Sequence, residues 1–70
     1  KMNYTVSQMV NLINAAEQVL PDLASELEEL AISYVDVPEV EVNSLLERYD
    51  YQSVNELFEA SSDDETFLYI

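Results

Sequence analysis

The side chains of this sequence that could do chemistry are almost all carboxylates. Fifteen Asp and Glu residues stand against Lys1 and Arg48, which gives a formal net charge of −13, and the chain has neither Cys nor His. Carboxylates can divide acid and base roles, bind hard cations, or pair with a partner's basic side chains. The thiolate nucleophile, the commonest general base and the commonest zinc ligand are missing. Binding therefore fits the composition better than catalysis.

Two further patterns argue against an enzyme or a metal protein. The chain contains no Gly, and loops that cradle nucleotide phosphates need backbone that turns at positive φ. The acidic stretch at residues 63–65 lacks the alternating oxygen ligands, central glycine and distant glutamate of a calcium-binding EF-hand loop. A carboxylate pair would need a pocket that perturbs one pKa, and no segment indicates a shielded acid. We expect no catalytic residue, no cofactor and no metal.

The acids form a row in the stretch PDLASELEEL, residues 21–30. Asp22, Glu26 and Glu29 recur at helical spacing, about a quarter turn from the leucines of the same stretch. Along a helix axis they are about 6 and 4.5 Å apart, close to one to two phosphate steps at ~3.4 Å per strand. Glu17 is the only acid among the first 21 residues. One side of the molecule should therefore be much more negative than the other.

The elements that must position this row are mainly helices. Thr5 with Gln8 resembles a capping box, and apolar residues then recur at helical spacing, which predicts a helix over residues 6–20. Pro21 breaks that helix and suits the first turn of a second one. The short connection predicts an antiparallel helical hairpin with facing apolar stripes. The second stripe consists of Leu23, Leu27, Leu30 and Tyr34.

Downstream of residue 35 the periodicity changes. Valines alternate with acids around Pro38 over residues 35–42, which predicts an extended segment or edge strand. Asn43 or Ser44 would cap a third helix, and Ser53 with Glu56 predicts a fourth short helix ending near residue 60. The closing TFLYI, residues 66–70, is typical of a terminal strand or an apolar plug.

These elements predict a mostly α fold, a small bundle of three to four helices. A short two-stranded pairing would join residues 37–42 to residues 66–70, and an α+β fold is the alternative. Residues 1–70 should form a single acidic domain that buries about 60% of its unfolded surface. Lys1 precedes Met2, so we expect Met2 to be the initiator and Lys1 an extra residue. No apolar run reaches the ~18 residues of a membrane span, and no signal peptide is visible, so we expect a cytoplasmic protein.

In size, charge and layout of acids, the whole chain resembles small phage-encoded proteins that mimic DNA. The resemblance implies an inhibitor in an infected bacterial host. Its acidic face would occupy the DNA-binding surface of a basic nucleic-acid-binding protein, such as a histone-like protein of the HU type, a restriction enzyme or a CRISPR effector. The protein itself would bind neither nucleic acid nor membrane. The expected partner-binding residues are Asp22, Glu26, Glu29, Asp36, Glu39, Glu41, Asp63, Asp64 and Glu65.

Other interpretations remain open. The chain could be an acidic protein–protein interaction or regulatory module whose specificity comes from an apolar patch, to which Ile32 would contribute. The acids could equally form a solvated face, or reflect adaptation to high salt. Arg48 is expected to pair with Glu47 or another nearby acid. Tyr49 is either a core residue or, with Tyr51, an interface residue that stacks on a partner's arginines.

Overall fold

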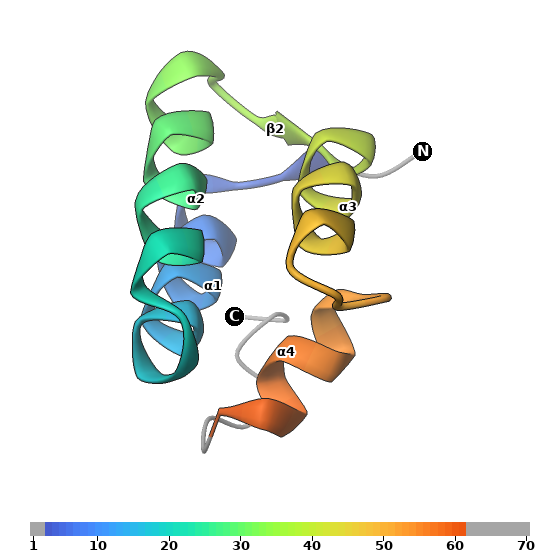
Figure 1. Cartoon of the computed structure of the whole chain (residues 1–70). Coiled ribbons are helices and arrows are strands. Elements are labelled where there is room, and N and C mark those ends of the chain that lie inside the picture. Colours follow the sequence, from blue (N-terminus) through green and yellow to red (C-terminus); the bar gives the residue numbers. More distant parts are fainter. Residues whose placement is uncertain (1–2, 62–70) are drawn as a thin grey trace.

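The computed structural model describes residues 3–61, and these form a mostly helical fold with one small antiparallel sheet (Figure 1). This confirms the predicted fold class. The elements in chain order are β1 (Asn3–Tyr4), α1 (Val6–Val19), α2 (Pro21–Ser33), β2 (Val37–Pro38), α3 (Glu39–Arg48) and α4 (Val54–Ala60). Among the described residues, none of the helices has the length and apolarity needed to cross a membrane.

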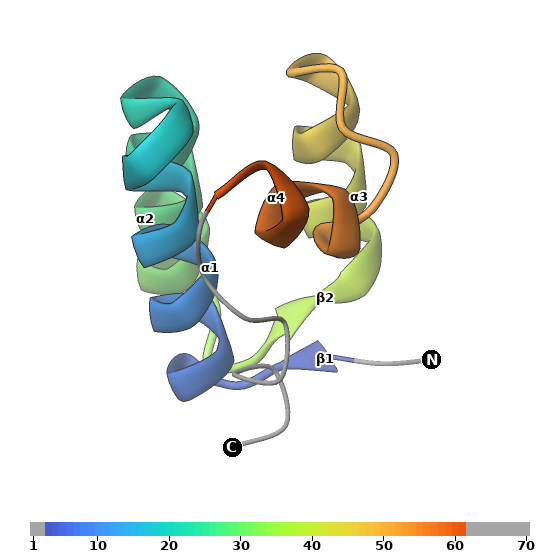
Figure 2. The ribbon, with the colours of Figure 1, turned by 90° about the horizontal axis from the view of Figure 1, so that it is seen from below.

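Helices α1 and α2 form the predicted antiparallel hairpin (Figures 1 and 2). The Thr5 side chain accepts from the Gln8 N–H at 3.2 Å, and the Gln8 side chain accepts from the Thr5 N–H at 3.0 Å. This reciprocal pair confirms the capping box and satisfies two backbone donors at the start of the helix. Leu20 alone joins the two helices, and Pro21 occupies the first turn of α2, where its missing N–H costs nothing.

The predicted extended segment at residues 37–42 is wrong beyond Pro38. β2 contains only Val37 and Pro38, and α3 begins at Glu39. Pro38 ends the strand, and the carboxylates of the first α3 turn suit the positive end of the helix dipole. The alternating valines then divide by helical position, because Val42 is buried while Val40 is 60% exposed. Asn43 and Ser44 consequently lie inside α3 and do not cap it.

The strand that pairs with β2 is one that the sequence does not indicate. β2 pairs antiparallel with β1, with Tyr4 opposite Val37 and Asn3 opposite Pro38. The expected partner strand, residues 66–70, lies outside the described residues. Because Tyr4 and Val37 are both buried, the pairing also contributes to the core.

The connection from α3 to α4 turns through a left-handed residue. The Tyr51 N–H donates to the Leu46 carbonyl at 3.0 Å, and the Asp50 N–H donates to the Glu47 carbonyl at 3.1 Å. These two bonds are those of a Schellman motif, and Asp50 occupies its left-handed position with φ 66°. Ser53 then caps α4 by accepting from the Glu56 N–H at 3.4 Å. The predicted fourth helix and its end at Ala60 are confirmed.

All four helices contribute to one hydrophobic core. Figure 2 shows α4 in the angle between the α1–α2 hairpin and α3. Leu12, Leu27, Leu46 and Phe58, one residue from each helix, are at most 2% exposed. This arrangement fixes α3 beside α2, and the two helices present a polar face to the outside. The largest fully buried side chains are Met9, Leu12, Leu23, Leu27, Val37, Val42, Leu46, Leu57 and Phe58.

A candidate acidic groove between two helices

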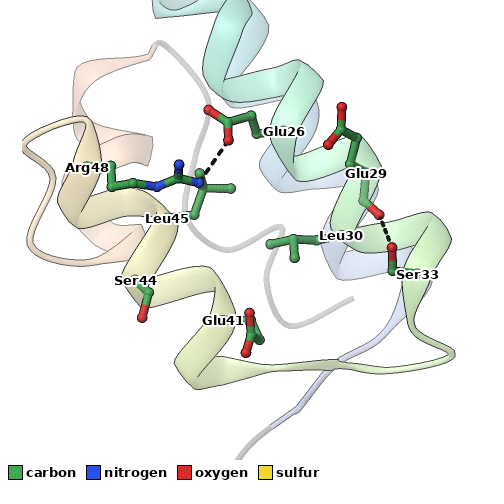
Figure 3. A pocket seen from close by; sticks show the side chains of 8 residues that line it. All are labelled: Glu26, Glu29, Leu30, Ser33, Glu41, Ser44, Leu45 and Arg48. Atoms are coloured by element: carbon green, nitrogen blue, oxygen red, sulfur yellow. Dashed lines mark hydrogen bonds and ion pairs between the residues drawn. The ribbon is translucent and has the colours of Figure 1, made fainter.

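A pocket of about 240 Å³ lies between α2 and α3 (Figure 3). Each helix supplies four side chains to it. In Figure 3, Leu30 and Leu45 point into the space between the helices, and the acids stand around them. The lining residues are Glu26, Glu29, Leu30 and Ser33 from α2, and Glu41, Ser44, Leu45 and Arg48 from α3. We call this set the acidic groove.

The helical repeat explains why these residues share one space. On α2 the lining residues start at Glu26 and follow at i+3, i+4 and i+7. On α3 they start at Glu41 and follow the same spacing. Residues three, four and seven positions apart share one face of an α-helix, so each helix presents a single stripe to the groove. Both stripes have one leucine in the middle and polar residues at the ends.

The two helices are joined across the groove through Glu26. The Arg48 Nη2 atom lies 2.8 Å from Glu26 Oε1, and the Tyr49 hydroxyl donates to Glu26 Oε2. Both carboxylate oxygens are therefore occupied. The side chain of Glu26 is 34% exposed and that of Arg48 is 65% exposed, so solvent screens this ion pair in part.

The Glu26 contacts shift the titration of two groups. The hydrogen bond from Tyr49 lowers the pKa of Glu26 below its ordinary value of 4.5, the Arg48 charge and hydrogen bond act in the same direction, and burial partly opposes them. The same hydrogen bond raises the pKa of Tyr49, and burial and the charges of Glu26 and Asp22 add to the shift.

The structure brings only part of the predicted site together. Glu26, Glu29 and Glu41 line one groove, whereas Asp22, in the first turn of α2, does not line it. Asp36 belongs to the α2–β2 connection and Glu39 to the first turn of α3, and neither lines the groove. The predicted residues Asp63, Asp64 and Glu65 lie outside the described part of the chain.

Glu26 has a different role from the other predicted acids. The sequence predicts a partner-binding role for Glu26 and a pairing of Arg48 with Glu47 or another nearby acid. Arg48 instead reaches Glu26, 22 positions earlier. Within residues 3–61, no side chain donates a hydrogen bond to the carboxylates of Glu29 and Glu41. These two acids are therefore the groove carboxylates available to a partner.

Sequence reasoning missed Tyr49 as a donor and the two serines of the groove. Tyr49 was assigned either to the core or to an interface, whereas it packs against the core and also hydrogen bonds to Glu26. The Ser33 hydroxyl donates to the Glu29 carbonyl at 2.9 Å, a bond within its own helix. The spacing of Glu41 and Arg48, seven positions apart, indicates a shared helical stripe but not the element that this stripe faces.

The groove can bind cationic groups. Arg48 already places a guanidinium beside a groove carboxylate, so the geometry suits a planar cation with several donors. In the described range of residues 3–61, no cluster of three or more Asp or Glu side chains is arranged to hold a metal ion. Comparison with known proteins found no protein-family model, no curated protein and no solved structure that matches this chain.

Proposed function

We propose that this chain is a DNA-mimic inhibitor that binds a basic nucleic-acid-binding protein through the acidic groove. Glu29 and Glu41, on opposite sides of the groove, would pair with arginine or lysine side chains that otherwise contact phosphates. A bacterial histone-like protein is a suitable target, because its binding to DNA depends little on sequence. Binding would displace DNA from the target, because both compete for the same cations.

One observation supports this proposal most directly. In the described chain the cation Arg48 is engaged by Glu26, while Glu29 and Glu41 in the same groove have no donor. The local charge therefore remains strongly negative after the internal pair has formed. Such uncompensated charge opposes folding, so its retention in a groove fits a role in binding.

The proposal can be tested by competition with DNA. A fluorescent DNA duplex is first bound to a purified bacterial histone-like protein, and this chain is then added while anisotropy is recorded. We expect release of the duplex at about 0.05 M salt and weaker release at about 0.2 M, because ion pairing with a polyanion-binding surface is salt-dependent. Retention of the duplex at both salt concentrations, with excess inhibitor, would contradict the proposal for this class of target.

Matched variants locate the effect in the groove. The double variant Glu29→Gln/Glu41→Gln should weaken competition by roughly 0.2–1 kcal/mol for each lost exposed ion pair. Glu17→Gln removes an exposed acid on α1, away from the groove, and should have little effect. Equal losses per removed charge in the groove variant and the α1 variant would show that net charge acts without a defined site. Glu26→Gln is unsuitable here, because Glu26 also joins α2 to α3.

A second candidate function is an interaction module that uses an apolar patch. Ile32 is 84% exposed and Val35 is 89% exposed, so both large aliphatic side chains are accessible to a partner. Binding through these residues would tolerate salt and would be lost in Ile32→Ser. Binding through the groove would instead weaken with salt and with Glu29→Gln/Glu41→Gln.

A further inference from the structure

An exposed apolar surface lies where α2 ends. Ile32 is in the last turn of α2, Tyr34 is its C-cap residue, and Val35 follows in the connection to β2. Their exposed fractions are 84%, 39% and 89%. We call these three residues the apolar tip. None of them lines the acidic groove, so the tip is a separate surface.

Acidic residues flank the apolar tip on both sides in the sequence. Glu28 precedes Ile32 by one helical turn, Glu29 lies three positions before it, and Asp36 follows Val35 directly. All three acids are exposed. Arg48, the cation of the described residues, is engaged on the far side of the groove by Glu26. A ligand of the tip must therefore tolerate or compensate these acids.

Charge decides between the occupants that an apolar surface could have. A second copy of this chain would bring another net charge of −13 against the first, which disfavours self-association. An anionic lipid surface would be repelled for the same reason. A cationic amphipathic helix has complementary chemistry, because its apolar side chains cover the tip while its lysines or arginines meet the surrounding acids.

We propose that the apolar tip binds a cationic amphipathic helix of a partner protein. The apolar side chains of that helix cover Ile32 and Val35, and its cations pair with Glu28 and Asp36. The contact adds a component of affinity that persists in salt, because burial of apolar surface is not screened. The proposal rests on the second candidate function above and does not depend on the acidic groove or on competition with DNA.

The test uses two synthetic peptides of identical lysine and leucine composition. In the first peptide the leucines recur at helical spacing, and in the second they are shuffled so that no apolar face forms. Binding to the full chain is measured by isothermal titration calorimetry at about 0.15 M salt, where the Debye length is about 8 Å. We expect the amphipathic peptide to bind at least about tenfold more tightly than the shuffled one. A tenfold difference in affinity corresponds to about 1.4 kcal/mol, which is less than the burial of one Leu or Ile side chain can supply.

Variants of the chain assign this difference to the tip. Ile32→Ser/Val35→Ser should reduce the affinity for the amphipathic peptide to that for the shuffled peptide. Val40→Ser is the matched control, since Val40 is 60% exposed on α3, at the other end of β2. It should leave the tenfold difference intact. Circular dichroism should show unchanged helix content, because the substituted side chains are exposed.

Three results would overturn the proposal. The first is equal affinity for the two peptides, which would show that charge alone accounts for binding. The second is a difference that persists in Ile32→Ser/Val35→Ser, which would place the apolar contact elsewhere. The third is a dimer in sedimentation analysis that Ile32→Ser dissociates, which would make a second copy the occupant.

Discussion

At the scale of single residues, Asp50 carries the clearest backbone constraint. It is the non-glycine residue with positive φ in the described chain, at 66°, and the Schellman motif that ends α3 requires this conformation. Glycine usually takes such a position, because a Cβ atom is disfavoured there. The chain contains no Gly, and a carboxylate next to a helix C-terminus is also unfavourable for the helix dipole.

We therefore predict that Asp50→Gly stabilises the protein by about 1 kcal/mol, through relief of the left-handed strain and of the unfavourable charge. Urea unfolding at neutral pH measures the effect. Asp50→Asn is the control, since asparagine removes the charge and keeps a side chain that tolerates this conformation. If Asp50→Asn gained as much as Asp50→Gly, the charge would account for the whole effect.

At the scale of elements, the link between α2 and α3 is the feature most open to a pH experiment. Glu26 has a lowered pKa in the folded state, so its ionised form is the one that Tyr49 and Arg48 stabilise. A group with a lowered folded pKa contributes stability above its unfolded pKa, near 4.5, and loses that contribution as the pH falls through the folded value.

We predict that Glu26→Gln has a lower melting midpoint than the unmodified chain at pH 7, and that this gap closes as the pH falls below 4.5. Thermal unfolding followed by circular dichroism measures both midpoints. Glu28→Gln is the matched control, an exposed acid on the same helix with no donor among the described residues. A gap that stayed constant down to pH 3 would show that ionisation of Glu26 does not contribute to stability.

Local signals predicted all four helices and the starts of three of them. The capping box at Thr5, the break at Pro21 and the cap at Ser53 each depend on a few neighbouring residues, so the starts of α1, α2 and α4 could be predicted. The start of α3 could not, because alternating valines around a proline are typical of a strand. The burial of Val42 against the core gave α3 its helical register, and that contact is tertiary.

The candidate site was predictable only in part, for a similar reason. The spacing of Asp22, Glu26 and Glu29 already indicated one face of one helix. Nothing local showed that α3 would face that row, or that Arg48 and Tyr49 would both bind Glu26 from 22 and 23 positions away. The pairing of β1 with β2 could not be predicted from the sequence either, since a strand of two residues is too short to show a periodic pattern.

At the scale of the whole molecule, repulsion among the acids should limit stability. The extents of the structure are 27 × 25 × 19 Å. At about 0.01 M salt the Debye length is ~30 Å, so every acid repels every other, whereas at about 0.1 M it is ~10 Å and only neighbours interact. One partly exposed ion pair cannot offset this repulsion.

We predict that the melting midpoint rises as NaCl is increased from about 0.01 to about 0.1 M, because screening relieves repulsion in the folded state. Differential scanning calorimetry measures the midpoint, and KCl at the same ionic strength controls for effects specific to one ion. Salt thus acts on folding and on groove binding in opposite directions. A midpoint that fell with salt would show that the Glu26–Arg48 pair outweighs the repulsion. A chain that is unfolded in dilute buffer would favour the interpretation that the acids reflect adaptation to high salt.

The pairing of Asn3 with Pro38 has a consequence for the order in which the chain can fold during synthesis. The first strand emerges from the ribosome long before its partner, so β1 stays unpaired until residue 38 has left the exit tunnel. By then every residue of the α1–α2 hairpin has left the tunnel, so we expect the hairpin to form first and to hold the two strand positions close to each other. The last two helices emerge later, so we expect them to pack on a platform that has already closed.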